Sequence, residues 1–369
     1  MRIFLVGGGT GGPTAPLIAV ARQIRKREPE TEFFFVGSGS VSERKLLSDS
    51  GFPIKILSVP AGKWRRYFSL WNLVDIFKFF FGFIRALFLI KRVRPDLVFG
   101  AGSFVQVPVA WAAFFCHVPV VVHQQDVRLL LATRLAAPVA KAVTATFDFA
   151  ALDLAAFSGM FKKIPKSKVV TTGNPIRLDV LSGTRAEAER IFKLNSNFPT
   201  VLALGGATGS VRMNEVVRKS LPELLKYVQL IHVTGPDKAG TVVSPHYHAY
   251  EFLGAEELRH AYAAADLVVG RAGMSTISEL SALGKPAILV PLPDSAQEDN
   301  ARLLAFFKSA VVVFQEFFDA ELLVRLVRKM LWSADLPASL SRNIKKLMPH
   351  DAAERVVKVL MKVYAESRK

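Results

Sequence analysis

The chain has 369 residues, 51% of them hydrophobic, and carries a formal net charge of +17 at pH 7. This length exceeds what one ordinary hydrophobic core holds, and the composition excludes a disordered chain, so we expect two globular domains. The single cysteine excludes an intrachain disulfide and indicates a reducing compartment, and the first strand begins so close to Met1 that we expect no signal peptide.

Short, uniformly apolar runs alternate with helical patterns along the chain. The first series of runs lies at 3–6, 33–36, 54–59, 97–99, 118–122 and 142–147, and the second at 200–204, 230–233, 267–269 and 287–290. Such strands are typical of parallel sheets that helices cover on both faces. We therefore predict an α/β fold of two Rossmann-like, doubly wound domains, at 1–178 and 179–345. Residues 346–369 are predicted to form an amphipathic helix that packs back on the first domain.

The first predicted strand runs into a glycine-rich loop, GGGTGGPTAP, at residues 7–16. Its spacing satisfies the dinucleotide-binding fingerprint, but the second strand ends in Gly37 and Ser38 without a carboxylate to hold a ribose, which disfavours a redox cofactor. Glycines let the backbone approach a ligand closely, and the following helix offers free N–H groups. The loop therefore predicts a phosphate site, in which Pro13 can neither accept nor donate a proton.

The segment at 63–95 is aromatic and long enough to suggest a membrane span. Asp75, Lys78 and Arg85 interrupt its apolar middle, however, and charges are costly at the bilayer centre. Eight lysines and arginines against one acid lie between Lys63 and Arg94, which indicates peripheral docking on an anionic membrane surface, with packing on the sheet as the alternative. We favour this partner over nucleic acid because no nucleic-acid-binding motif is present. The residues expected at the membrane are Trp64, Arg65, Arg66, Trp71, Phe79 and Phe80.

The second predicted domain repeats the pattern of a strand followed by a glycine loop. The strand at 200–204 runs into Gly205, Gly206 and Ala207, and the strand at 267–269 runs into Arg271-Ala272-Gly273 and a helix start. Both loops are expected to hold anions at helix N-termini. Facing loops on two domains would suit a diphosphate-linked donor and a second anionic substrate in a cleft.

The helix after Gly273 carries groups suited to a nucleotide sugar. Glu279, one turn into it, could accept hydrogen bonds from two ribose hydroxyls, and Gln297 and Asn300 share the face of a later helix. The structural alternatives are a solvated helix face for Glu279 and helix capping by Ser275 and Thr276. Taken together, the segment favours nucleotide-sugar binding.

At these residues the chain resembles the peptidoglycan glycosyltransferases that convert lipid I to lipid II, the MurG family. The resemblance runs nearly end to end and rests on GGGTGG, GAGSFVQVP, HQQD, GNPIR, GGATG, RAGMSTISE and the Gln297-x-x-Asn300 segment. It implies a GT-B fold, in which two Rossmann-like domains face a cleft. It also implies inverting, metal-independent transfer of GlcNAc from UDP-GlcNAc to a polyprenyl-diphosphate-linked acceptor. The protein would be peripheral, at the cytoplasmic face of the cell membrane. A different lipid acceptor and a catalytically impaired binding homologue are the alternatives.

The resemblance also implies roles for individual residues. Phe252 and Leu253 would face uracil, Glu279 would hold the ribose, and Gln297 and Asn300 would contact GlcNAc. The donor set is Thr10, Gly11, Gly12, Asp126, Arg177, Ala207, Phe252, Leu253, Arg271, Gly273, Met274, Ser275, Thr276, Ser278, Glu279, Gln297 and Asn300. The acceptor or phosphate loops would contribute Gly9, Ser103, Gln106, Gly205 and Gly206.

Several residues depart from the family's pattern and leave the general base open. Pro13 stands where the family usually has a histidine, Ala207 replaces a serine, and His123-Gln124-Gln125-Asp126 replaces HEQN. Asp126 is the first candidate base, because a carboxylate has replaced an amide at the end of a predicted strand. His123 is the second candidate, although a histidine there is more often structural. The third possibility is that positioning and leaving-group stabilisation suffice.

Overall fold

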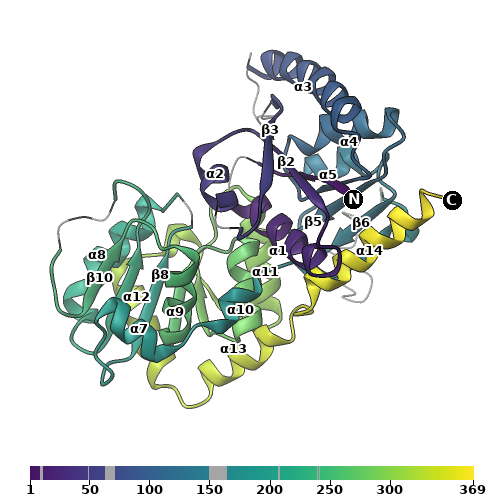
Figure 1. The fold of residues 1–369 in the computed structure, drawn as a ribbon. Helices are drawn as coiled ribbons and strands as arrows, with labels where there is room; N and C mark the ends of the chain where they lie inside the picture. The colour runs from purple at the N-terminus through teal and green to yellow at the C-terminus, as the bar shows by residue number, and fades with distance from the viewer. Residues whose placement is uncertain are drawn as a thin grey trace. The chain divides into compact units, whose positions relative to one another are not determined.

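The computed structural model describes residues 1–8, 11–48, 50–62, 71–148, 164–206, 208–238, 240 and 242–369. These residues form two compact units. The first comprises Met1–Arg177 and Pro349–Lys369, and the second comprises Leu178–Met348. The C-terminal segment therefore completes the unit in which the chain begins (Figure 1).

The first unit is built on a seven-stranded parallel sheet in the order β3-β2-β1-β4-β5-β6-β7. The order reverses between β1 and β4, and doubly wound sheets bind ligands beyond the carboxyl ends of the strands at such a switch point. The loops after β1 and β4 are therefore placed to bind a ligand. The strands are β1 (Arg2–Val6), β2 (Glu32–Gly37), β3 (Ile54–Ser58), β4 (Leu97–Gly100), β5 (Val120–Gln124), β6 (Ala142–Ala145) and β7 (Val169–Thr171).

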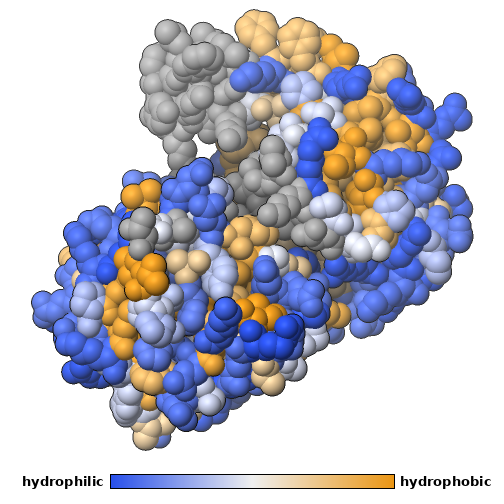
Figure 2. Space-filling model, turned by 60° about the vertical axis from the view of Figure 1, so that its left-hand side comes forward, coloured by the Kyte–Doolittle hydropathy of each residue, from blue (hydrophilic) through white to orange (hydrophobic). Residues whose placement is uncertain are grey.

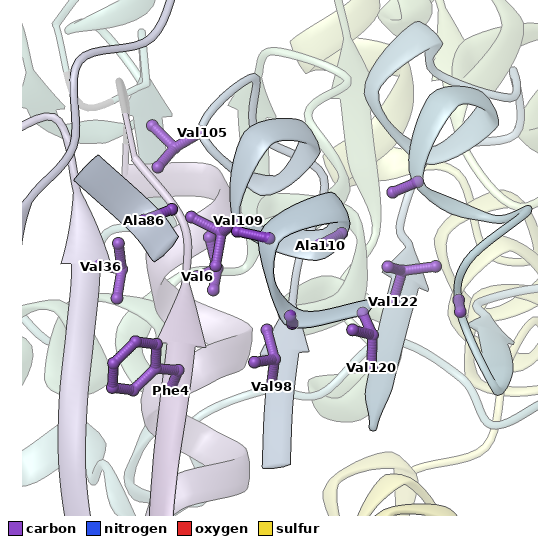
Figure 3. Packing of buried hydrophobic residues seen from close by; sticks show 14 of the residues in the cluster. Phe4, Val6, Val36, Ala86, Val98, Val105, Val109, Ala110, Val120 and Val122 are labelled. Atoms are coloured by element: carbon purple, nitrogen blue, oxygen red, sulfur yellow. The ribbon is translucent and has the colours of Figure 1, made fainter. Parts of the chain in front are cut away.

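Helices cover both faces of this sheet because alternate strand residues enter two separate cores. Ile3 and Leu5 pack with α1 (Gly11–Arg27), α2 (Val41–Ser48) and the terminal helix α14 (Ala352–Glu366). Phe4 and Val6 point to the opposite face, where α3 (Trp71–Val93), α4 (Gln106–Phe115) and α5 (Leu131–Ala136) lie (Figure 3). A short 3-10 turn, Lys166–Lys168, precedes β7.

The second unit has a six-stranded parallel sheet in the order β10-β9-β8-β11-β12-β13. Its switch point lies between β8 and β11, so the loops after these two strands are placed to bind a ligand. The strands are β8 (Thr200–Leu204), β9 (Gln229–Val233), β10 (Tyr247–Tyr250), β11 (Leu267–Gly270), β12 (Ala287–Leu289) and β13 (Val311–Val312). The helices are α7 (Arg185–Phe192), α8 (Val211–Leu224), α9 (Ala255–Ala264), α10 (Met274–Leu283), α11 (Ala296–Phe306), α12 (Ala320–Trp332) and α13 (Leu336–Lys345), with 3-10 turns at Leu178–Ser182 and Gln315–Phe317.

The predicted α/β fold with two Rossmann-like parallel sheets is confirmed. Three strands, β7, β10 and β13, were not predicted. Each lies at a sheet edge and is partly exposed. The strands β7 and β13 are only three and two residues long, and β10 lacks the uniformly apolar character of a central strand. Among the described residues, no helix is long and apolar enough to cross a membrane.

Candidate functional site

The loop after β8 delivers a helix N-terminus to the switch point of the second unit. Gly209 has φ +70°, and a Cβ atom there would overlap the carbonyl oxygen of Thr234 beyond β9. Only glycine fits this approach. The loop ends at Ser210, the N-cap of α8, whose Oγ accepts from the Met213 N–H at 3.3 Å. The first turn of α8 can therefore stabilise an anion, as predicted from Gly205 and Gly206, while Ala207 lies outside the described residues.

The loop after β11 delivers a second helix N-terminus to the same edge, because β11 is the neighbour of β8 in the sheet. The N-cap of α10 is Gly273, which has no side chain to satisfy the first N–H groups. Ser275 Oγ is buried and makes no hydrogen bond within the described part of the chain. Buried polar groups of this kind need a partner, so this turn is suited to a polar ligand. Met274 is buried and Thr276 half-buried in the same turn. The Ser278 hydroxyl is bonded to the Met274 carbonyl at 2.6 Å.

Glu279 is held by a residue that sequence reasoning missed. Its Oε2 accepts from the hydroxyl of Tyr262 on α9 at 2.9 Å, and the side chain of Tyr262 is 1% exposed. Glu279 is half-buried, so it does not lie on a simply solvated helix face. The predicted uracil-facing residues come just before α9: Phe252 is exposed and Leu253 is buried. In the sequence, Tyr262 looks like any apolar core residue, and only the need of a buried phenol for a partner would have marked it.

Gln297 and Asn300 on α11 contact the loops around α10. The Asn300 amide is buried and donates to the Ala272 carbonyl at 3.2 Å, so it fastens the loop before α10. Gln297 is half-exposed, and its Oε1 accepts from the Leu292 N–H at 3.0 Å. A Cβ atom on Gly273 would lie 3.8 Å from Gln297 Nε2. The structure thus brings Gln297 to the N-terminus of α10.

Arg271 is buried in the second unit, where its guanidinium group donates hydrogen bonds to other groups of the protein. Its Nη1 donates to the carbonyl oxygens of Val290 and Pro291, and its Nη2 donates to Ser210 Oγ at 2.6 Å and Gln315 Oε1 at 2.7 Å. Desolvation lowers the pKa of Arg271. The predicted place near the anion loop fits this position, but the side chain acts through Ser210, the N-cap of α8. Arg177, predicted near the same phosphates, is half-buried and is the last residue before the chain enters the second unit.

In the first unit, the loop after β1 runs directly into α1. This helix begins at Gly11, and Gly12 and Pro13 follow in its first turn, where the missing N–H of proline costs little. A Cβ atom on Gly7 would lie 2.7 Å from Leu17 Cδ1, so the loop is packed tightly on α1. The predicted contacts Gly9 and Thr10 lie outside the described residues.

A buried carboxylate, Glu43, lies beside this loop. Its Oε1 accepts from Ser38 Oγ at 2.5 Å and its Oε2 from the Gly39 N–H at 2.8 Å, and a Cβ atom on Gly8 would be 3.0 Å from Oε1. Ser40 and Glu43 also form a reciprocal capping box at the start of α2. The strand β2 itself ends without a carboxylate, as the sequence indicated, but the first turn of α2 brings Glu43 back to this edge, where the loop itself engages both of its oxygens. The pattern Ser40-x-x-Glu43 is the sequence signal for this contact.

The loop after β4 holds two buried polar groups at the N-terminus of α4. Gln106 is 1% exposed, and its Oε1 accepts from the Gly102 N–H at 2.8 Å. Gln106 Nε2 and Ser103 Oγ are buried and make no hydrogen bond with any described residue. Burying such a group unsatisfied costs about 1–3 kcal/mol. This cost favours the predicted role of the loop, which is to bind an oxygen-rich ligand.

The structure does not place His123 where it could take a proton from a substrate. The side chain is 0% exposed, with Nδ1 2.9 Å from Thr144 Oγ1 and Nε2 3.0 Å from Asn174 Oδ1. Burial lowers the pKa of His123 to about 4, so the ring is neutral at pH 7. Both nitrogens are engaged, and the geometry is that of a residue that fastens the GNPIR segment to β5.

Asp126 lies on the loop after β5, at the carboxyl edge of the same sheet, as predicted. It is half-buried, and its carbonyl accepts from Gln124 Nε2 at 2.8 Å. Gln125 Nε2 donates to the Ala101 carbonyl at 2.9 Å, which joins this loop to the one that carries Ser103 and Gln106. Asp126 therefore belongs to the same group of loops as the two buried polar residues after β4.

Comparisons with known proteins agree with this geometry. The model of the glycosyltransferase family 28 N-terminal domain matches residues 3–145, and that of the family's C-terminal domain matches residues 200–356. The chain belongs to glycosyltransferase family 28. The two matched regions contain all the loops described above except the GNPIR segment.

Relatives within the family match this chain over nearly its whole length. The UDP-N-acetylglucosamine--N-acetylmuramyl-(pentapeptide) pyrophosphoryl-undecaprenol N-acetylglucosamine transferase of Lachnoclostridium phytofermentans is 36% identical over 368 residues, which cover 98% of this chain and 99% of the relative. The protein of the same name from Lachnospira eligens is 34% identical, with 97% and 98% covered. These matches confirm the resemblance to the MurG family.

Solved structures share the fold. MurG of Acinetobacter baumannii superposes with a TM-score of 0.70 at 23% identity, covering 98% of this chain and 99% of that one. The glycosyltransferase of kitacinnamycin gives a TM-score of 0.73 at 14% identity, with 98% of both chains covered. At such identities the likeness concerns the fold alone.

Proposed function

We propose that this chain transfers GlcNAc from UDP-GlcNAc to undecaprenyl-pyrophosphoryl-MurNAc-pentapeptide, lipid I, and so forms lipid II with inversion at the sugar C1. The relatives named for this reaction are 34–36% identical over nearly the full chain. The structural observation that carries the proposal is the start of α10. There, a glycine N-cap and the buried hydroxyl of Ser275 are followed, one turn on, by the half-buried carboxylate of Glu279.

The second unit supplies groups for each part of the donor. The N-termini of α8 and α10 would face the diphosphate and stabilise the charge that develops as UDP leaves, an effect worth several kcal/mol when the dipoles are preorganised. Glu279 would accept from the ribose hydroxyls. Phe252 and Leu253 would meet uracil, and Gln297, beside Gly273, would contact GlcNAc. We propose that the charge of the diphosphate is met in this way without a resident metal.

The acceptor is proposed to bind at the first unit. Ser103 and Gln106 offer buried donors at the N-terminus of α4, and the glycine loop before α1 offers backbone N–H groups, so both suit a lipid-linked diphosphate. The acceptor hydroxyl attacks C1 from the face opposite UDP and must lose a proton. Asp126, on the neighbouring loop, is the proposed base. His123 is not, because it is buried and engaged on both nitrogens.

Peripheral docking on the cytoplasmic face of the membrane is proposed through α3 and α4. Phe77, Phe80 and Phe81 on α3 are 64%, 56% and 61% exposed, and Phe114 and Phe115 on α4 are 50% and 60% exposed. Lysines and arginines lie among them, at residues 78, 85, 91 and 92. Figure 2 shows hydrophobic residues at the top of the molecule, the height at which α3 lies in Figure 1.

Two of the predicted membrane residues, Phe79 and Phe80, are exposed on α3. Phe79 is 39% exposed and Phe80 56%. Trp71 is the first residue of α3, while Trp64, Arg65 and Arg66 lie outside the described residues. Exposed phenylalanines with basic neighbours favour insertion at an anionic interface, where apolar burial and charge attraction add.

Transfer of radiolabelled GlcNAc from UDP-GlcNAc to a soluble lipid I analogue, with and without anionic vesicles, tests the proposal. Labelled disaccharide product is expected, and it would show that a histidine after the first glycine loop is dispensable. Binding of UDP-GlcNAc without transfer to lipid I would contradict the proposed acceptor, and a screen of other lipid acceptors would then separate a changed acceptor from a binding role.

A further inference from the structure

Tyr262 is a buried phenol whose hydroxyl has a specific partner. Its ring is fully packed in the second unit, with 1% of the side chain exposed, on the last turns of α9. A buried tyrosine needs a hydrogen-bond partner for its hydroxyl. Here the partner is Oε2 of Glu279 at 2.9 Å, on a different helix and 17 positions further along the chain. A carboxylate is a strong acceptor, so this contact is a charge-assisted hydrogen bond.

We propose that Tyr262 is a positioning residue for nucleotide recognition, which fixes the Glu279 carboxylate so that it can accept from both hydroxyls of a ribose. The inference rests on the proposed function and deepens it, because it assigns part of the donor's recognition to a residue that does not itself touch the donor. Glutamate has three rotatable side-chain bonds. A hydrogen bond that already fixes one carboxylate oxygen lowers the conformational entropy that the Glu279 side chain would otherwise lose when the ribose binds.

The position of Tyr262 supports this role over simple packing. The helix that carries it, α9, begins immediately after Phe252 and Leu253, the turn proposed to meet uracil. Gly254 is the N-cap of α9, and its N–H donates to Glu257 Oε2 at 2.7 Å, which fixes the start of the helix. One hydrogen bond therefore links the helix that follows the base-binding turn to the helix that carries the ribose carboxylate. Loss of the Tyr262 hydroxyl should affect recognition of the ribose rather than that of the base or the phosphates.

Tyr262→Phe removes the hydroxyl and keeps the ring, and binding of UDP and of 2′-deoxy-UDP to the full chain by calorimetry provides the test. We expect the wild type to bind UDP more tightly than 2′-deoxy-UDP. In Tyr262→Phe, the affinity for UDP should fall about tenfold, as for a hydrogen bond to a charged group, while the affinity for 2′-deoxy-UDP falls less. In a Glu279→Ala background, the Tyr262 substitution should have no further effect, since the two groups act as one.

Tyr247→Phe is the matched control, because Tyr247 is 5% exposed and its hydroxyl lies 2.9 Å from His232 Nδ1. It should lower the melting temperature comparably without changing the ratio of the UDP and 2′-deoxy-UDP affinities. An unchanged ratio in Tyr262→Phe, whether or not its melting temperature falls, would show a purely structural role and overturn the inference. A wild type that binds no UDP would instead remove the proposed function, and this inference with it.

Discussion

Acid should destabilise the protein through two buried histidines, His123 in the first unit and His232 in the second. Burial lowers the pKa of each ring from 6.5 to about 4. Because the folded-state pKa lies below the unfolded-state value, the unfolded chain binds the proton first as the pH falls. The stability that depends on the neutral rings is therefore complete above about pH 6.5 and is lost as the pH falls from there towards 4.

The size of the loss follows from these values. One pKa unit corresponds to about 1.36 kcal/mol, so each histidine should remove about 2 kcal/mol of the free energy of unfolding between pH 7 and pH 5. Urea unfolding followed by circular dichroism at the two pH values measures this loss. In His123→Gln and in His232→Gln, the acid-induced loss should be smaller by about 2 kcal/mol, because one titrating ring is gone.

His350→Gln is the matched control, since His350 is exposed, and it should show the acid-induced loss of the wild type. Ring proton resonances of the wild type provide an independent measurement. The two buried histidines should not titrate between pH 7.5 and pH 5. If they titrate in that range, or if both buried-site variants lose as much stability as the wild type, the rings do not sit in the water-excluded sites described here.

Four further predictions concern the reaction and its surfaces. Asp126→Asn should lower turnover by about 10²–10⁴-fold while UDP-GlcNAc binding persists, and unchanged turnover in a folded variant would exclude this base. Gly209→Ala should weaken UDP binding and cost more stability than Gly51→Ala, because both have positive φ but only the first Cβ atom would meet a carbonyl oxygen; equal costs would contradict this account. Phe80→Ser should weaken sedimentation with anionic vesicles about tenfold, whereas Phe306→Ser, which replaces a somewhat more exposed phenylalanine in the other unit, should not. Chelation of divalent metals should leave transfer unchanged, and loss of activity restored by a metal would refute metal independence.

The central parts of both sheets could be predicted because helices bury them on both faces, which forces uniformly apolar strands. The edge strand β10 could not, since one side meets solvent and its sequence, Tyr-His-Ala-Tyr, lacks that signature. The strand β5 also extends further than its apolar run, through His123 and Gln124, whose polar groups are satisfied by neighbouring segments. Sequence patterns report apolar burial, and they miss polar strand residues whose burial depends on a hydrogen-bond partner outside the strand, whether distant along the chain, as for His123, or near, as for Gln124.

The candidate site likewise has parts that the sequence predicts and parts that it does not. Glycine loops and helix starts are local, so GGATG and RAGMSTISE could be predicted from sequence. The partners that fix the site are distant along the chain: Tyr262 with Glu279, and Arg271 with Gln315. No spacing rule indicates such pairs, because they arise only once the strand order brings their segments together.

Asn214 shows how one such distant contact prepares a loop for its ligand. It lies in the first turn of α8, where its Nδ2 donates to the Thr234 carbonyl at 2.8 Å and its Oδ1 lies 3.1 Å from His232 Nε2. These bonds fasten the start of α8 to the end of β9 through side chains. These side-chain bonds use none of the backbone N–H groups of the helix start, which are the groups that a diphosphate needs; of those groups, Ser210 caps that of Met213. Because neutral His232 belongs to this network, a histidine that makes the second unit sensitive to acid is also one that positions its proposed phosphate site.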